Sequence, residues 1–493
     1  MATSNGYWAA RAHSTWRFVP GSERHWGKAA LRLAFLTHRW VGIVTCLFFA
    51  MWFASGLVML YMPYPSLSPA ESWAGAQPID WSRVGRAPVV SDARRITLEM
   101  RDAVPVWRIE SRDGDTRILS AEGGAVSPVD DALAARVATR FAGPVRTVER
   151  IADDQWTVAG GFDRHRPLWK VALADAAGTE LYISSLTGQP VQRTTRGQRF
   201  WNWLGSVPHW IYPTLLRRDR EAWRQAVMWV AGPCIAVALT GLWIGIWRLR
   251  TGRRRYRGGR MTPYRGWMLW HHVSGLAGGV MLTSWIVSGW LSVDPGHAFA
   301  GGEAPVAAMR AYAGRAGEPR DLDRLARIAP DARSIEWSGD AGFARIAVDR
   351  ASPHPLWLEQ ATLSPAHAAD PLRAAMLVPD GRRVAREWLV RPDFYWTDAT
   401  RLPLWRLRFD DAAATWLYVD PMSGALVERQ DRTRRAYRWV YTLLHTWDWP
   451  WLTAHFWVWT GWMWLWSLAG LVLSISGVVL GWRRLRRPAR AKR

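Results

Sequence analysis

Long runs of apolar residues are the main feature of the hydropathy pattern. A membrane-spanning helix needs about 20 such residues, and four runs reach that length. The predicted spans are 33–62, 226–247, 266–293 and 456–482. The first run exceeds the ~7 to 15 apolar residues of a signal-peptide core and no small-residue cleavage site follows it, so we expect an uncleaved anchor. The pattern predicts a multi-pass membrane protein.

Arginine-rich segments flank these runs. Short loops rich in arginine stay in the cytoplasm, and the chain has three such segments, namely 1–32, 248–265 and 483–493. We therefore expect both termini in the cytoplasm. The long inserts at 64–200 and 294–436 then lie outside, each followed by an interfacial segment, 201–225 or 437–455. In a bacterium with two membranes this topology predicts an inner-membrane protein with periplasmic inserts.

Within the first insert, apolar and polar residues alternate over short stretches, which is typical of strands. Strands are expected at 106–109, 118–119, 169–171 and 181–184, the last two forming a hairpin. A helix is expected near 131–141. The sequence predicts that each insert forms a small α+β domain.

The two halves of the chain repeat each other. From the inserts into the following spans, matching residues recur 236 positions apart over about eighty residues. The pairs include Tyr182 and Tyr418, Gly188 and Gly424, Trp203 and Trp439, His209 and His445, Gly241 and Gly477, and Gly245 and Gly481. Spans one and three repeat at 233 positions, and pair His38 with His271, Gly42 with Gly275, and Ser55-Gly56 with Ser288-Gly289. This register predicts duplication of a unit made of span, outer domain and span.

Composition narrows the chemistry. The 37 tryptophans exceed what a soluble core needs and are typical of interfacial aromatic belts. The net charge of +23 would suit nucleic acid, but the densest basic clusters flank apolar runs, so we expect the lipid bilayer and no nucleic acid as partner. The only cysteines are Cys46 and Cys234, which excludes a disulfide scaffold and a thiolate metal site. Any metal ligands must be histidine, carboxylate or methionine.

Four histidines are paired by the repeat. His38 and His271 lie near the cytoplasmic ends of spans one and three, and His209 and His445 lie just outside spans two and four. Ionisable residues at membrane depth are costly and point to function, although a single interfacial histidine can also bind a headgroup or a carbonyl. Two neutral imidazoles at equal depth can face each other across a bundle and form the axial ligands of a b-type haem.

Small residues accompany these histidines. Gly42 and Gly275 lie one helical turn after His38 and His271, where a missing side chain leaves room for a porphyrin edge, although such glycines also serve helix packing. Ser55 follows His38 by 17 residues, or about 26 Å of helix, which is the depth of the outer histidines. The same small residues can therefore line a second haem.

A zinc site is the competing interpretation, but the sequence lacks H-E-x-x-H and paired cysteines. His272, which points about 100° around the helix from His271, and His455 remain spare candidates for a ligand position, as does His165. A further set of residues, the arginines near the outer histidines, can attract an anionic complex. They are Arg196, Arg199, Arg434 and Arg435.

A family resemblance follows from these motifs. The pattern W-x-[VL]-x9-L-Y-[IV]-x3-[ST]-G, then an interfacial histidine and a span, together with His-x3-Gly spans, resembles the PepSY-associated transmembrane proteins over nearly the whole chain after about residue 30. The resemblance implies four transmembrane helices with two PepSY-like α+β inserts, and haem ligands at His38, His271, His209 and His445. The family's usual Leu-His-Arg is replaced by Pro208-His209-Trp210 and Leu444-His445-Thr446.

Members of that family include inner-membrane haem proteins of iron uptake that reduce ferric siderophores in the periplasm. The resemblance therefore implies a haem-dependent oxidoreductase with two b-type haems that reduces a ferric siderophore or related iron chelate. No nicotinamide or flavin fingerprint is visible, which favours quinol or a partner protein as electron donor. The alternative is a non-redox membrane protein whose PepSY modules bind or inhibit a partner protein or assist a siderophore transporter.

Overall fold

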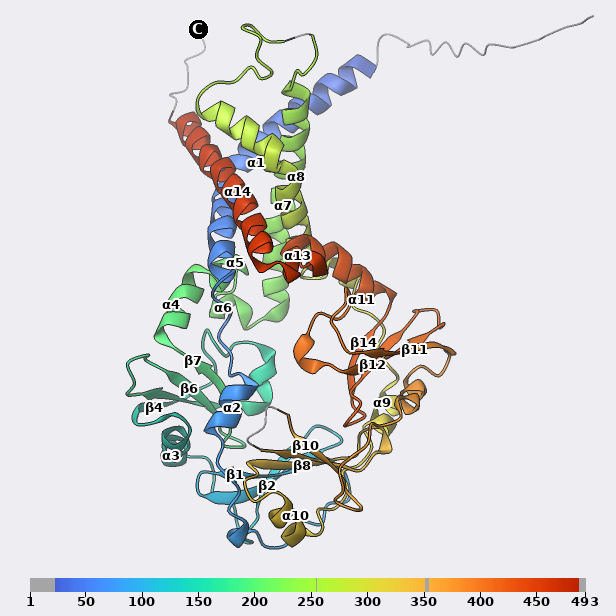
Figure 1. Ribbon diagram of the computed structural model, residues 1–493. Helices are drawn as coiled ribbons and strands as arrows, with labels where there is room; N and C mark the ends of the chain where they lie inside the picture. Colours follow the sequence, from blue (N-terminus) through green and yellow to red (C-terminus); the bar gives the residue numbers. More distant parts are fainter. Residues whose placement is uncertain (1–22, 254, 351–353, 487–493) are drawn as a thin grey trace, which may run out of the picture. The chain divides into compact units, whose positions relative to one another are not determined.

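The computed structural model describes residues 23–253, 255–350 and 354–486 (Figure 1). Among these residues, four helices are long and apolar enough to cross a membrane. They are α1 (Glu23–Met59), α7 (Arg220–Arg248), α8 (Trp267–Leu291) and α14 (Phe456–Leu485). Each overlaps one predicted span, although α1 and α7 begin at Glu23 and Arg220, before the predicted starts at 33 and 226. The outer parts of the predicted basic ends, 1–22 and 487–493, lie outside the described residues.

The ends of these helices have local causes. α1 stops at Met59, shortly before Pro63, whose ring cannot continue a helix. α14 carries Arg483 and Arg484 in its last turn, where positive charge interacts favourably with the helix dipole. The length and composition of the four helices are those of membrane-spanning segments and are consistent with a multi-pass membrane protein.

The chain divides into two compact units. The first, called here the helical unit, comprises Met1–Leu47, Pro233–Thr283 and Val472–Arg493. The second, the insert unit, comprises Phe48–Gly232 and Ser284–Leu471. His38 and His271 belong to the helical unit, whereas His209 and His445 belong to the insert unit.

Two four-stranded antiparallel sheets of the insert unit have the same order. One is β4 (Val145–Ile151), β5 (Leu168–Leu173), β6 (Glu180–Ser184) and β7 (Pro190–Thr194). The other is β11 (Arg383–Leu389), β12 (Leu404–Phe409), β13 (Trp416–Val419) and β14 (Leu426–Gln430). Helix α3 (Asp131–Ala142) buries Leu133 and Val137 against Val171 and Leu181 of the first sheet. The hairpin predicted at 169–171 and 181–184 is therefore confirmed as β5 and β6.

The third sheet differs from the expectation of one self-contained domain per insert. Its order is β10 (Leu356–Glu359), β9 (Arg345–Asp349), β8 (Ser334–Ser338), β1 (Ala93–Arg101), β2 (Val104–Ser111) and β3 (Thr116–Ser120). Strands β1 and β8 come from different inserts and pair with Leu98 opposite Ile335. The pairing satisfies two strand edges that would otherwise be open, and Trp107 packs on Trp337 at 5.6 Å between ring centroids.

Short helices connect the sheets to the long helices and carry the outer histidines. They include α4 (Arg196–Leu204), α5 (Ser206–His209) and α6 (Thr214–Arg217) in the first interfacial segment. The second segment contains α11 (Arg432–Tyr437), the π-helix η7 (Arg438–Leu443), α12 (Leu444–Thr446) and α13 (Pro450–Ala454). The remaining α-helices are α2 (Pro69–Gly75), α9 (Val306–Tyr312) and α10 (Leu322–Ile328).

Candidate functional site: two histidine pairs

The inner histidines face each other in the helical unit. His38 on α1 and His271 on α8 have ring centroids 6.1 Å apart. Nδ1 of His38 donates to the carbonyl oxygen of Val237 at 3.0 Å. Nδ1 of His271 lies 3.3 Å from the carbonyl oxygen of Leu473 and 3.1 Å from Oγ of Ser476. Each ring is thus fixed through Nδ1 by a neighbouring long helix, α7 or α14.

Glycines on those neighbouring helices make room for the inner rings. A Cβ atom on Gly241 would lie only 2.4 Å from Cε1 of His38. The equivalent atom on Gly477 would lie 3.6 Å from Cε1 of His271, an ordinary contact. Gly241 therefore permits a close approach that no other residue allows without moving the ring.

Gly42 and Gly275, for which the sequence leaves open a porphyrin edge or helix packing, lie against side chains of neighbouring helices. Cβ atoms at these positions would meet side chains of Val237 and Leu473 at 3.6 and 3.4 Å. These are the two residues whose carbonyl groups accept from the inner histidines. The glycines thus bring α1 and α8 close to the residues that orient the rings.

The outer histidines form a second pair in the insert unit. The ring centroids of His209 and His445 are also 6.1 Å apart. Nδ1 of His209 lies 3.1 Å from Oγ of Ser55, and Nδ1 of His445 lies 3.0 Å from Oγ of Ser288. These are the two serines that the sequence predicts at this depth.

Backbone contacts fix the outer pair further. The indole of Trp52 donates to the carbonyl oxygen of His209 at 3.0 Å, and the indole of Trp285 donates to that of His445 at 2.9 Å. Beside the rings lie Gly56 and Gly289, whose added Cβ atoms would be 3.3 and 3.4 Å from the Cε1 atoms. Sequence reasoning missed the two tryptophans, because the excess of indoles in the chain hides them.

The serine contacts determine which ring nitrogen carries the proton. Ser55 donates its hydroxyl proton to the carbonyl oxygen of Met51 at 2.6 Å, and Ser288 donates to that of Trp285 at 3.0 Å. Each serine oxygen therefore accepts from the histidine, whose Nδ1 is the protonated nitrogen. The carbonyl acceptors impose the same tautomer on the inner pair. In all four rings Nε2 carries the free lone pair.

Burial keeps the outer rings neutral. Removal from water lowers the pKa of His209 to about 3, with the nearby His445 as a smaller cause. It lowers the pKa of His445 to about 4. Near neutral pH both imidazoles are uncharged, which is the form that binds a metal.

The geometry of both pairs fits one iron between two imidazoles. A metal–imidazole bond of about 2 Å, added to roughly 1 Å from nitrogen to ring centre, places two opposed rings about 6 Å apart. The observed centroid distances are 6.1 Å in each pair. Among the described residues, no hydrogen bond occupies the Nε2 atoms. Metal-bound histidines characteristically donate their other nitrogen to a carbonyl or hydroxyl oxygen, as these do.

The outer region also contains buried donors without acceptors. Within the described residues, the indole nitrogens of Trp447, Trp462 and Trp466 are buried and unpaired. The rings of Trp447 and Trp462 are in contact, 5.3 Å apart, and Trp447 follows His445 by two residues. Unsatisfied donors of this kind are costly, and the carboxylates of a bound porphyrin are suitable acceptors.

The spare histidines do not join either pair. His272 uses both nitrogens, Nε2 with the carbonyl oxygen of Gly245 at 2.9 Å and Nδ1 with Thr262 at 3.0 Å. His455 is exposed and bonds through Nδ1 to the carbonyl oxygen of Trp451. His165 bonds with Ser184 in the first insert. Among the residues that the structure describes, no three histidine, cysteine, aspartate or glutamate side chains form a group that could hold a metal ion.

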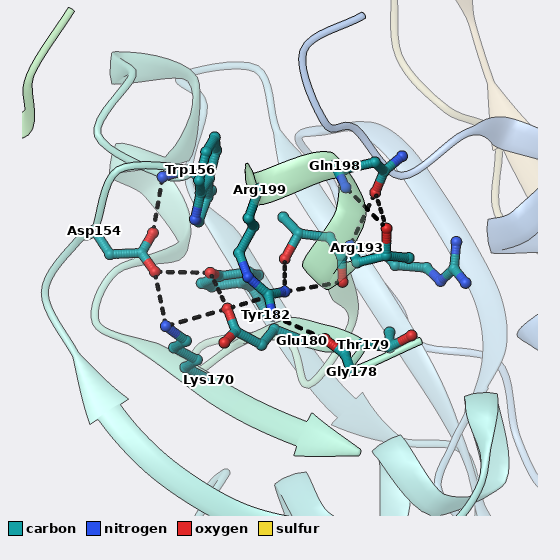
Figure 2. Close-up of polar contacts among 12 residues, drawn as sticks. Asp154, Trp156, Lys170, Gly178, Thr179, Glu180, Tyr182, Arg193, Gln198 and Arg199 are labelled. Atoms are coloured by element: carbon teal, nitrogen blue, oxygen red, sulfur yellow. Dashed lines mark hydrogen bonds and ion pairs between the residues drawn. The ribbon is translucent and has the colours of Figure 1, made fainter. Parts of the chain in front are cut away.

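Charged residues of each insert form a polar cluster around one tyrosine. In the first, Lys170 lies 3.2 Å from both Asp154 and Glu180, and the hydroxyl of Tyr182 donates to Asp154 at 2.7 Å (Figure 2). Burial alone would lower the pKa of Lys170, but the two carboxylates raise it. Arg199 joins this cluster through Glu180 at 3.4 Å.

The corresponding cluster of the second insert is built around Arg406, which donates to the hydroxyl of Tyr418 at 3.1 Å and pairs with Asp393. Arg435 donates to two backbone carbonyl groups nearby. Two of the four arginines expected to attract an anion, Arg199 and Arg435, therefore hold their own inserts together. Arg434 instead lies over the ring of Tyr437, and Arg196 lies beside Gly178.

Comparison with known proteins adds no assignment. No family model matches this chain, and no curated protein matches it.

Proposed function

We propose that this chain is a haem-containing electron-transfer protein of the bacterial cytoplasmic membrane. It binds two b-type haems, one between His38 and His271 and one between His209 and His445. One observation carries this proposal. In each of two separate histidine pairs the ring centroids are 6.1 Å apart, and Nδ1 of every ring contacts an oxygen atom. A single accidental ring contact would not recur with the same tautomer and spacing.

Haem supplies one-electron chemistry by cycling its iron between the ferrous and ferric states. The chain's own residues determine where and how the group sits. Val237, Leu473, Ser55 and Ser288 hold the four rings through Nδ1, which leaves Nε2 of each ring as the nitrogen that would bind the iron. Half-buried rings among apolar helices provide the low dielectric that tunes an iron site.

We further propose that the chain arose by duplication and belongs with the PepSY-associated proteins. The matching contacts support this. Residues bound to the rings of the first half, such as Ser55 and Val237, recur as Ser288 and Leu473 at the same 233 and 236 offsets that the sequence repeat shows. The two four-stranded sheets also share strand order and register, with Lys170 opposite Tyr182 and Arg406 opposite Tyr418.

Electrons are proposed to enter at the inner pair from quinol or another membrane donor and to leave at the outer pair. The acceptor is a ferric siderophore or related iron chelate in the periplasm. Support comes from the arginine-rich segments, which favour a cytoplasmic location for 248–265, and from the membership of His209 and His445 in the unit that carries the inserts.

The first experiment is a reduced-minus-oxidised absorption spectrum of the purified full-length protein, with haem and protein quantified on the same sample. The proposal expects a b-type spectrum and two haems per chain. It also expects reoxidation of the dithionite-reduced protein by a ferric siderophore under anaerobic conditions. A protein purified from haem-replete cells without haem would contradict the proposal.

Topology is tested separately. A reporter fused near Gly178 should behave as external, and one near Gly258 as cytoplasmic, because arginine-rich loops stay inside. The reverse result would contradict the proposed direction of electron flow without affecting the haem assignment.

A further inference from the structure

In the part of the chain that the structure describes, a series of aromatic ring contacts leads away from His445 in the second half and has no counterpart at His209. The ring of Tyr441 lies 5.5 Å from that of His445, and the ring of Tyr437 lies 4.9 Å from that of Tyr441. All three are half-buried. The side chains follow one another at intervals of four residues on α11, η7 and α12, so they form a continuous series of ring contacts.

The described residues of the first half lack this series. At the 236-residue offset, Gly205 corresponds to Tyr441 and Trp201 to Tyr437. Among the described residues, the ring contact made by His209 is with His445. The second half also has a π-helix at Arg438–Leu443, an irregularity that is frequent at functional sites. The two halves therefore hold their histidines alike but connect them differently to the insert.

Tyr437 is the far end of the series and lines a cleft of about 330 Å³. Aromatic side chains of Tyr395 and Trp396 form part of its wall, together with Arg434 and Arg438. This cleft lies entirely within the insert unit. It is large enough to admit one aromatic arm of a chelate.

Arg438 supplies an unused donor at the cleft. Its side chain is only 12% exposed, and it bonds to Asp448 and to the carbonyl oxygen of Phe394 through Nη1 and Nε. Nη2 is buried without a partner in the part of the chain that the structure describes. A buried guanidinium donor left unpaired is costly, and the positive charge of Arg438 at the cleft wall attracts an anionic oxygen of a ligand.

We infer that Tyr441 and Tyr437 couple the outer haem electronically to an anionic aromatic metal chelate bound in this cleft, so that electrons leave through the second half of the chain. This inference rests on the proposed function, since it assumes a haem at His445. The tyrosine rings lie between His445 and the cleft, so that the electron crosses short gaps between neighbouring rings instead of one wide gap. Electron-transfer rates fall steeply with the width of such a gap.

The step is balanced as a one-electron exchange. One electron passes, so the haem iron is oxidised from Fe(II) to Fe(III) and the chelated iron is reduced from Fe(III) to Fe(II). No proton moves and no bond is broken in the protein. The tyrosine hydroxyl groups are therefore not required, and only the rings matter.

The chelate class follows from the cleft. The cleft is lined by three arginines, Arg401, Arg434 and Arg438, and by two carboxylates, Asp398 and Glu428, so its lining keeps a net positive charge that suits negatively charged oxygen atoms. The half-buried ring of Tyr395 suits contact with an aromatic ring of the ligand. Together these features favour a catecholate-type chelate over an uncharged hydroxamate. The two classes can be compared directly with gallium(III) complexes, which have the shape and charge of the ferric complexes but are not reduced under these conditions.

The coupling is tested by replacing the ring. Tyr441→Leu in the full-length haem-loaded protein should slow reoxidation of the dithionite-reduced protein by ferric tricatecholate by about tenfold, equivalent to roughly 1.4 kcal/mol of barrier. Tyr441→Phe keeps the ring and should retain the wild-type rate. The haem spectrum should be unchanged in both variants. If Tyr441→Leu loses haem, Tyr437→Leu replaces it in the same rate measurement, because Tyr437 lies one ring farther from His445. Equal rates in the leucine and wild-type proteins would overturn the inference.

Binding to the cleft is tested without any redox step, by quenching of tryptophan fluorescence with gallium tricatecholate. Arg434→Gln should weaken binding by about two- to fivefold, as expected for loss of one exposed charge. Arg432→Gln is the matched control, because it removes an exposed arginine from the same helix α11 without lining the cleft. Gallium trihydroxamate should bind more weakly than the catecholate.

The two tests separate the inference from the proposed function. A protein that lacks haem but binds gallium tricatecholate through Arg434 would refute electron transfer and keep the cleft as a ligand site. A haem protein in which Arg434→Gln and Arg432→Gln bind the chelate equally, or in which the hydroxamate binds as tightly, would refute the cleft and leave the haem assignment intact.

Discussion

In the first half of the chain, His209 is preceded four residues earlier by Gly205, whereas the second half has Tyr441 at the position equivalent to that glycine. The bonds to the two rings are nevertheless the same, with a serine oxygen at 3.1 Å in one half and 3.0 Å in the other. The contacts that hold the two rings are therefore alike in both halves. The aromatic contacts around the rings differ, because Tyr441 contacts His445 whereas a glycine stands at the equivalent position before His209.

The inner pair shows a similar divergence in packing. The space beside His38 admits no Cβ atom on Gly241, which would be 2.4 Å away, whereas Gly477 leaves an ordinary 3.6 Å beside His271. Glycine is thus required at position 241, whereas position 477 has room for a Cβ atom. Substituting alanine at each position therefore tests whether the two halves differ.

The largest expected effect comes from the histidines themselves. Alanine at His38 or at His271 should remove one of the two haems, because a single axial ligand leaves a five-coordinate iron in a loosened pocket. The other haem should remain, as judged by haem content and the difference spectrum. Alanine at His209 or at His445 should have the complementary effect and also slow reoxidation by a ferric chelate.

Spare histidines provide the controls for those variants. His272→Ala and His455→Ala should keep both haems, since neither ring faces a partner histidine. Unchanged stoichiometry in both inner variants would contradict the inner assignment. Loss of haem only in His272→Ala would instead show that the inner ligand is the adjacent histidine.

A smaller effect is expected from the glycines beside the inner rings. Gly241→Ala should displace His38 and lower the occupancy of the inner haem, because overpacking of this kind typically costs about 1–3 kcal/mol. Gly477→Ala should bind haem almost as the wild type does. Haem titration of the two purified variants measures the difference. Equal occupancies would contradict the asymmetry between the halves.

The smallest effect is expected in the inserts. Tyr182→Phe removes hydroxyl contacts to Asp154 and Glu180, and should lower the free energy of unfolding by about 1–2 kcal/mol. Tyr418→Phe removes the contact with Arg406 and should cost a similar amount. Thermal unfolding followed by circular dichroism tests both, with haem content as the control. A loss in only one variant would show that the clusters are not equivalent.

The long helices and the histidine pairing can be predicted well from the sequence, because both depend on local or periodic information. Apolar runs determine the spans, and the constant offset by itself aligns His38 with His271. The β5–β6 hairpin is also local, since few residues separate its strands.

Contacts between distant segments could not be predicted in the same way. The pairing of Leu98 with Ile335 depends on which two strand edges meet, and no local pattern specifies that partner. Backbone acceptors such as Val237 depend on the rotation of one helix against another, so side-chain motifs do not reveal them. For the same reason the close approach of Gly241 to the ring of His38 could not be predicted from the sequence.

The central claim is that each histidine pair holds one iron between two imidazoles. Electron paramagnetic resonance of the oxidised purified protein tests it most directly, with spins counted against protein concentration. The account predicts two low-spin ferric centres per chain, one of which disappears in His38→Ala and the other in His445→Ala. A spectrum without low-spin ferric signals, or one unchanged by both substitutions, would contradict it.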